Sequence, residues 1–261
     1  MGLQNESKLS ALARLLPEGV AAPSVWLASQ GFSRQLVRKY VKGGWLEPLA
    51  RGVFVRPPQP VDPNGIILGI QHLAGAPFHL GGLSALTRQG HVQYLQLGFE
   101  AAIHLWGRNA APAWVTAIKL RERFVFHRER LFEERANTVG LVRLPTRVRD
   151  WTLIASSLER AIIEVLSLVG ENESGFVHAA ELFEGLTAIR PKVVNELLAA
   201  CRSLKAKRLF LFLGAHYQYP WFEKLDRSAI DLGKGKRLIV RGGRYDSEFR
   251  ITVPERFGAE R

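Results

Sequence analysis

Apolar residues in the first part of the chain recur at spacings that predict three short helices. Residues 8–16 carry a stripe of leucines that suits a supporting helix. A second helix is expected over 23–30, where a proline suits the first turn and Gly31 ends the helix. Ser33 can cap a third helix because its hydroxyl can accept from a free amide, and Gly43-Gly44 supplies the termination signal.

The third helix is predicted to have one apolar and one basic face. The apolar positions at helical spacing are Leu36, Val37, Tyr40 and Val41. The opposite face carries Arg34, Gln35, Arg38, Lys39 and Lys42. Two short apolar runs follow, 45–49 and 52–55, and predict a hairpin with Arg51 near its tip. Residues 1–57 are therefore interpreted as a winged helix-turn-helix domain.

This arrangement predicts contact with double-stranded operator DNA. The candidate contact residues are Ser33, Arg34, Gln35, Arg38, Lys39, Lys42 and Arg51. Residues in the first turn of the third helix would reach base edges, and the later cations would contact the backbone. Arg51 would add a phosphate or minor-groove contact from the wing. The alternative is an ordinary amphipathic surface helix whose basic face is merely solvated.

The remaining residues, 58–261, predict a larger mixed domain, so that the whole chain is α+β. The proline-rich stretch 57–65 indicates the boundary by its composition. Helices are expected over 66–73, 84–89, 177–186 and 191–204, and from Ser156, which has capping-box spacing to Glu159. Strands are expected within 92–104 and over 115–118 and 124–127, with a terminal hairpin of 237–240 and 249–253. The apolar run 209–213 is compatible with either a buried helix or a strand.

Charge favours an anionic partner. The chain of 261 residues has 36 Lys and Arg against 24 Asp and Glu, a net charge of +12. The excess is densest in residues 1–57, with eight basic and three acidic side chains. No apolar run approaches the length of a membrane span, so no membrane partner is expected. Cys201 is the single cysteine and is expected to be a buried apolar filler, and a cytoplasmic location is the natural interpretation.

Signals for catalysis are weak. The seven histidines lack ligand spacing, so no metal site and no cofactor are predicted. The 233–236 segment, Gly-Lys-Gly-Lys, lacks the spacer and the hydroxyl residue of a phosphate loop. A nuclease would need carboxylates for a divalent cation, and only Asp226 and Asp231, or the Glu6-Ser7-Lys8 triplet, present themselves. No catalytic residue is predicted.

Several blocks of the chain, taken together, resemble the AbiEi antitoxin family. The blocks are residues 198–212, 221–226, 231–237 and 251–254, with Leu80-Gly81-Gly82-Leu83-Ser84-Ala85-Leu86 and Ser157-Leu158-Glu159-Arg160-Ala161. The resemblance implies the antitoxin of a two-gene module whose toxin has a nucleotidyltransferase fold. It also implies that the N-terminal winged helix represses the module's own promoter at inverted repeats, while the larger domain opposes the toxin.

The same resemblance directs attention to basic residues of the C-terminal domain. These are Lys205, Lys207, Arg208, Lys236 and Arg237. They are expected to form a basic surface, and a purely structural or solubility role is the alternative. The hypothesis is therefore a non-enzymatic antitoxin and repressor. A transcription factor with a C-terminal ligand-sensing domain and a DNA-cleaving enzyme are the competing hypotheses.

Overall fold

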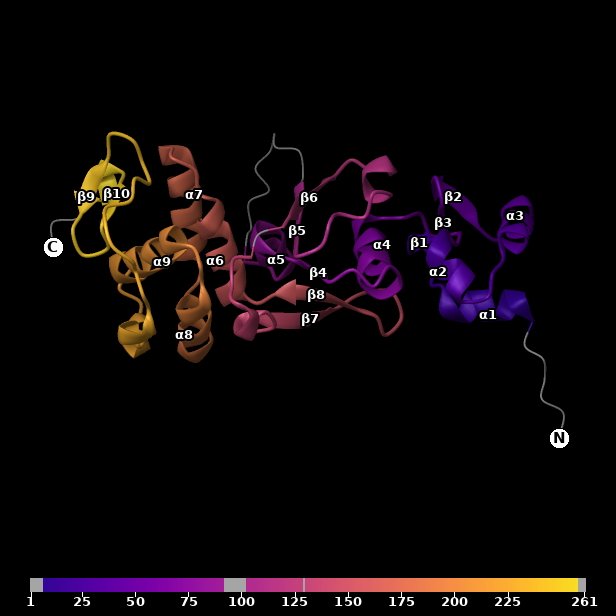
Figure 1. The fold of residues 1–261 in the computed structure, drawn as a ribbon, viewed down its shortest axis with the longest axis horizontal. Helices are drawn as coiled ribbons and strands as arrows, with labels where there is room; N and C mark the ends of the chain where they lie inside the picture. The colour runs from indigo at the N-terminus through magenta and orange to yellow at the C-terminus, as the bar shows by residue number, and fades with distance from the viewer. Residues whose placement is uncertain (1–6, 92–101, 129, 258–261) are drawn as a thin grey trace. The chain divides into compact units, whose positions relative to one another are not determined.

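The computed structural model describes residues 7–91, 102–128 and 130–257. Its chain, coloured from the N- to the C-terminus in Figure 1, divides into two compact units. The first contains residues 1–80, 100–128 and 143–154, and the second contains residues 81–99, 129–142 and 155–261. The first unit thus combines the predicted DNA-binding module with a sheet. The division of roles between residues 1–57 and 58–261 stays a prediction.

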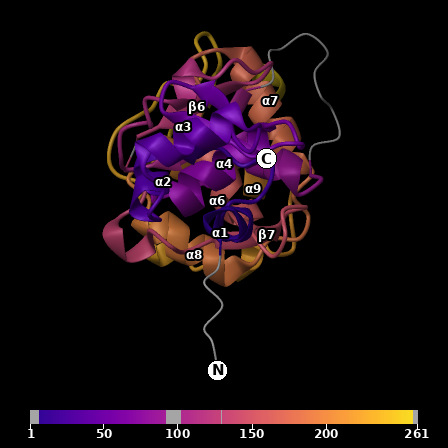
Figure 2. The same ribbon diagram turned by 90° about the vertical axis from the view of Figure 1, so that its right-hand side faces the viewer.

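The N-terminal elements are α1 (Lys8–Leu15), β1 (Ala22–Pro23), α2 (Ser24–Ser29), α3 (Arg34–Lys42), β2 (Glu47–Ala50) and β3 (Val53–Val55). The three helices and the hairpin follow the predicted order. The sequence predicts no strand at β1, and Pro23 lies in that strand, directly before α2, and not in the first turn of the helix as expected. The strands form a three-stranded antiparallel sheet in the order β1-β3-β2. Figure 2 shows the three helices from the N-terminal side. Their shared core consists of Leu12, Leu16, Leu27, Phe32, Val37, Tyr40, Leu46, Val53 and Val55.

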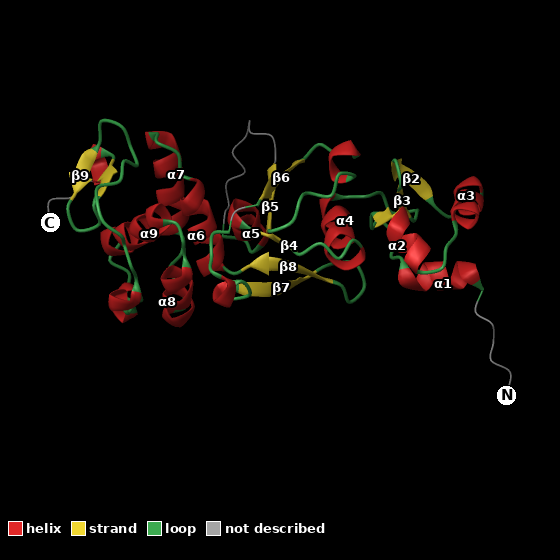
Figure 3. Ribbon diagram, in the orientation of Figure 1, coloured by secondary structure: helices red, strands yellow, loops and turns green. Residues whose placement is uncertain are grey.

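The rest of the first unit contains most of a five-stranded sheet, whose strands are yellow in Figure 3. The ends of two of these strands belong to the second unit. The sheet follows α4 (Pro63–Leu68) and the π-helical turn η1 (Gly69–Leu73). Its strands are β4 (Phe78–Leu80), β5 (Ala102–Gly107), β6 (Arg123–His127), β7 (Leu141–Pro145) and β8 (Thr152–Ser156), in the order β6-β5-β4-β8-β7. The predicted strand at 115–118 is wrong, because backbone bonds between residues three apart close a 3₁₀ turn, η2 (Val115–Ala117). Residues 92–101 of the predicted strand 92–104 lie outside the described residues.

Helices form the core of the second unit. They are α5 (Gly82–Arg88), α6 (Leu158–Leu168), α7 (Glu173–Glu184), α8 (Pro191–Ala200) and α9 (Leu204–His216). Short 3₁₀ turns are η3 (Glu134–Ala136), η4 (Phe222–Lys224), η5 (Arg227–Ala229) and η6 (Glu255–Phe257). The ambiguous run 209–213 is a fully buried part of α9.

Two predicted elements of the second unit need correction. The helix expected over 191–204 is broken, because Cys201 has extended backbone angles and Ser203 caps a new helix by accepting from the amide of Ala206. The terminal hairpin pairs β9 (Arg244–Asp246) with β10 (Ile251–Val253). The expected partner 237–240 forms no strand, and it contacts β10 through an isolated bridge at Arg237 and through two amides that donate to the Thr252 hydroxyl. The Gly242-Gly243 turn therefore precedes the hairpin.

Candidate nucleic-acid interface

Helix α3 is closed at both ends by the signals expected from the sequence. The Ser33 hydroxyl accepts from the amide of Leu36 at 3.2 Å, which satisfies one free donor of the first turn. At the other end Gly44 has a φ of 71°, a left-handed conformation that suits glycine. The amide of Trp45 donates to the carbonyl of Tyr40 at 2.9 Å, completing a Schellman motif.

The two faces of α3 differ as predicted. Val37 and Tyr40 are buried in the module. All five residues of the opposite face are exposed, namely Arg34, Gln35, Arg38, Lys39 and Lys42. The helix contains no acidic residue, so its exposed face combines four cations and one amide. Such a face can neutralise phosphates and hydrogen-bond to base edges.

The β2–β3 hairpin stands beside the start of α2. Arg51 is exposed at its turn, and the next residue, Gly52, has a φ of 75°. The carbonyl of Gly52 accepts from the amide of Ser24 at 2.7 Å. This bond fixes the hairpin turn against α2, and it leaves the Arg51 side chain in solvent.

Contacts from the five-stranded part of the same unit hold the module in place. Arg149, in the turn between β7 and β8, donates through both terminal nitrogens to the carbonyls of Ala13 and Arg14 at the end of α1. Helix α4 approaches the backbone before β1 so closely that a Cβ on Gly65 would lie 1.9 Å from the carbonyl oxygen of Gly19. The composition of 57–65 indicates a boundary, but the chain around it is tightly packed. No local sequence signal predicts either contact.

The expected C-terminal basic surface is wrong for two of its five residues. Lys207 and Arg208 are 5% and 1% exposed, because they lie on the buried part of α9. The Arg208 guanidinium donates to the carbonyls of Leu232, Gly235 and Arg250, and the Lys207 ammonium donates to that of Asp231. Burial lowers the pKa of Arg208, with neighbouring arginines acting in the same direction.

The other three basic residues are more accessible. Lys205 is half-buried and donates to the carbonyl of Val169. Lys236 and Arg237 are exposed, and the Lys236 ammonium lies 4.8 Å from the ring centre of Tyr245. These positions do not form one surface with the buried pair. The structural alternative therefore accounts for Lys207 and Arg208.

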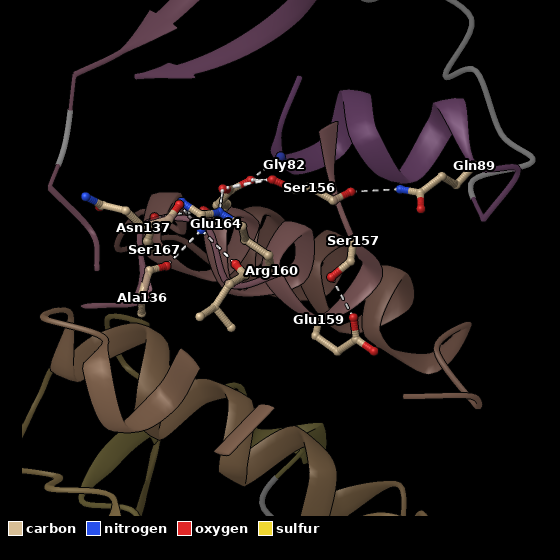
Figure 4. A network of polar contacts seen from close by, with 11 residues as sticks. Gly82, Gln89, Ala136, Asn137, Ser156, Ser157, Glu159, Arg160, Glu164 and Ser167 are labelled. Carbon is tan, nitrogen blue, oxygen red and sulfur yellow. Dashed lines mark hydrogen bonds and ion pairs between the residues drawn. The ribbon is translucent and has the colours of Figure 1, made fainter. Parts of the chain in front are cut away.

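A buried polar network lies in and beside two of the segments that resemble the family, 80–86 and 157–161 (Figure 4). The carboxylate of Glu164 accepts from the amide of Gly82 and the hydroxyl of Ser156, each at 2.8 Å, and from Arg160 Nε at 3.1 Å. Arg160 also donates to three backbone carbonyls, those of Ala136, Asn137 and Val139. The network joins α5, α6 and the turn at η3. Its donors and acceptors are paired with one another, so it stabilises the unit.

The predicted capping box of Ser156 and Glu159 is wrong, because no side chain caps the start of α6. Ser157, not Ser156, precedes α6, and its hydroxyl donates to Glu159 Oε2 at 2.6 Å. Glu159 also accepts two bonds from the Arg190 guanidinium, each at 2.9 Å. Burial raises the pKa of Glu159, but the bonds from Arg190 and Ser157 outweigh it and lower that pKa to about 2.

The carboxylates considered for a nuclease occupy ordinary turns. Asp226 accepts from the amide of Ser228, and Asp231 accepts from that of Gly233. Glu6 of the Glu6-Ser7-Lys8 triplet lies outside the described residues. Within the described ranges, no three His, Cys, Asp or Glu side chains converge as metal ligands. None of the helices in this part of the chain has the length and apolar character of a membrane span.

Comparison with known proteins identifies the family. The family model described as "Transcriptional regulator, AbiEi antitoxin, Type IV TA system" matches residues 100–254, and that of the AbiEi antitoxin N-terminal domain matches residues 5–97. No curated protein matches. The crystal structure of the RV2827C protein from Mycobacterium tuberculosis has a similar fold, with 18% identity, a TM-score of 0.58, and coverage of 94% of this chain and 89% of that chain. The chain belongs to the AbiEi antitoxin family of transcriptional regulators from type IV toxin–antitoxin systems.

Proposed function

We propose that the chain represses its own promoter through α3 and neutralises a nucleotidyltransferase-type toxin without being an enzyme itself. The observation that carries the DNA-binding part is the exposed face of α3, which holds four cations and no acid between a capped first turn and a hairpin. Family membership supports a role as regulator and antitoxin. Both roles place the protein with DNA and toxin in the cytoplasm.

The proposal assigns two kinds of DNA contact to residues at different positions along α3. Arg34 and Gln35 lie in the first turn, which enters the major groove when a helix-turn-helix docks, so they would read base edges. Arg38, Lys39 and Lys42 lie farther along the same face and would contact phosphates. Arg51 at the hairpin turn would add a contact from the wing.

Binding measurements on full-length protein test this assignment. Two probes are needed, a duplex selected by the protein from a randomised pool and a duplex of random sequence. Replacing Arg34 or Gln35 with Ala should weaken binding to the selected duplex by about 1–3 kcal/mol and leave binding to the random duplex nearly unchanged. Lys42→Ala should weaken binding to both duplexes and reduce the slope of log affinity against log salt concentration by roughly 0.9.

Lys192→Ala serves as the control, because Lys192 is an exposed lysine of α8 in the second unit and belongs to none of the candidate sites. Its affinity for both duplexes should match that of the unchanged protein. If the α3 variants and this control lost the same affinity, general charge would explain the binding and the assigned interface would be rejected.

The antitoxin role is tested separately in full-length protein. A variant with Ala at both Arg34 and Lys42 should lose promoter repression but still protect cells that express the cognate toxin. Such a result supports the division of roles between residues 1–57 and 58–261. Loss of both activities in a folded variant would contradict it.

A further inference from the structure

Trp45 is an exposed aromatic residue three positions after the last residue of the basic helix α3. Its side chain is 51% exposed, although burying an indole stabilises a folded protein. In residues 34–51 it is accompanied by five cations and a single acid, Glu47. An apolar ring among cations suits an anionic partner that also has an apolar surface.

The backbone around Trp45 is held rigidly. The amides of Gly44 and Trp45 donate to the carbonyls of Val41 and Tyr40, which closes α3 with a Schellman motif. The amide of Leu46 also donates to the Tyr40 carbonyl, at 3.3 Å. The indole therefore projects from a fixed point of the chain.

The absence of a side chain at Gly43 gives the indole its place. A Cβ at Gly43 would lie 3.1 Å from Cδ1 and 3.5 Å from Nε1 of Trp45, so the ring lies against the end of α3. The same Cβ position is 3.4 Å from the carbonyl oxygen of Lys39. Since Lys39 and Gly43 are four residues apart, they share one side of the helix. The indole thus borders the basic face on the side of Lys39.

We propose that Trp45 packs on the sugar-phosphate backbone of the DNA held by α3. The deoxyribose offers an apolar surface to the ring, and a phosphate oxygen can accept from its Nε1 hydrogen. The proposal rests on the proposed DNA-binding function and adds a neutral residue to the interface. Such a contact is independent of base sequence and releases no counterions, because the indole carries no charge.

These properties separate Trp45 from its neighbours in a binding experiment with full-length protein. Trp45→Ala should weaken the selected and the random duplex by the same factor, about tenfold, as expected when about 60 Å² of apolar surface leaves water. The salt slope should stay that of the unchanged protein. Trp45→Phe keeps an aromatic ring without the N–H donor, and its loss should be smaller than that of the Ala variant.

Tyr245→Ala provides the matched control, because Tyr245 is an aromatic residue of the second unit with 37% exposure. It should leave both affinities unchanged. Circular dichroism checks that each variant is folded, and the Phe variant decides the test if the Ala variant does not fold.

Three outcomes would overturn the inference while leaving the proposed function intact. In the first, Lys42→Ala weakens binding and the Trp45 variants do not. In the second, Trp45→Ala affects only the selected duplex, which would assign the indole to base recognition. In the third, the free protein sediments as a dimer that the Trp45 variant disrupts, so a second copy covers the ring. If the unchanged protein bound neither duplex, the proposed function itself would fail.

Discussion

The ion pair between Glu159 and Arg190 should make the stability of the second unit sensitive to acid. Glu159 is 2% exposed and accepts from the Arg190 guanidinium at two positions and from the Ser157 hydroxyl. Glu159→Gln keeps the size of the side chain and removes its charge. The variant is therefore expected to unfold more easily at neutral pH and to show a flatter response to acid.

The size of the effect follows from the pKa of Glu159, which is lowered from 4.5 to about 2. A change of one in pKa corresponds to about 1.4 kcal/mol, so the upper limit of the contribution to the unfolding free energy is roughly 3 kcal/mol. Arg190 is 59% exposed, so solvent screens the pair and about 2 kcal/mol is the better expectation. Because the folded-state pKa is depressed, this stabilisation is fully present above about pH 4.5 and is lost as the pH falls towards 2.

Urea denaturation followed by far-UV circular dichroism measures this contribution. The difference in unfolding free energy between the unchanged protein and Glu159→Gln should be about 2 kcal/mol at pH 7 and should shrink steadily below about pH 4.5. Glu196→Gln is the control, since Glu196 is an exposed glutamate of α8. Its difference should be small throughout. A Glu159→Gln difference that stayed constant from pH 7 to pH 2.5 would refute the reasoning.

Two further predictions concern packing and thiol chemistry. Gly69→Ala should destabilise the protein by roughly 1–3 kcal/mol in urea denaturation, although alanine normally favours a helix, because its Cβ would lie 2.2 Å from the carbonyl oxygen of Ala21. Equal or higher stability would show that α4 and η1 can move away from this backbone. Cys201 is 3% exposed and burial raises its pKa to about 11, so a thiol reagent at pH 8 should label it only after denaturant is added. Rapid labelling of the native protein would contradict this placement.

The sequence predicts the N-terminal module well because its signals are local. Ser33 and Gly44 act within one helical turn of their own position, and each has the role expected of its residue type. The alternation of apolar and basic residues on α3 likewise depends only on helical spacing. Nearby residues are sufficient to determine these features.

Features that depend on distant partners could not be predicted. Lys207 and Arg208 look like surface residues in the sequence. Inside the unit, however, backbone carbonyls more than twenty positions later accept hydrogen bonds from their side chains. Ser156 and Glu159 have the spacing of a capping box, but Glu164 instead takes the Ser156 hydroxyl. Sequence spacing shows which residues can meet, and packing determines which of them do.

The glycines of α4 and η1 have a consequence for engineering this protein. Gly65 and Gly69 let a helix outside residues 1–57 touch the backbone at Gly19 and Ala21. A chimera that joined residues 1–57 to a foreign domain would lose this packing and expose the backbone that α4 and η1 contact. Residues 1–57 alone are therefore not expected to keep their fold in a chimera. A chimera that preserves the fold of the DNA-binding part should also include α4 and η1.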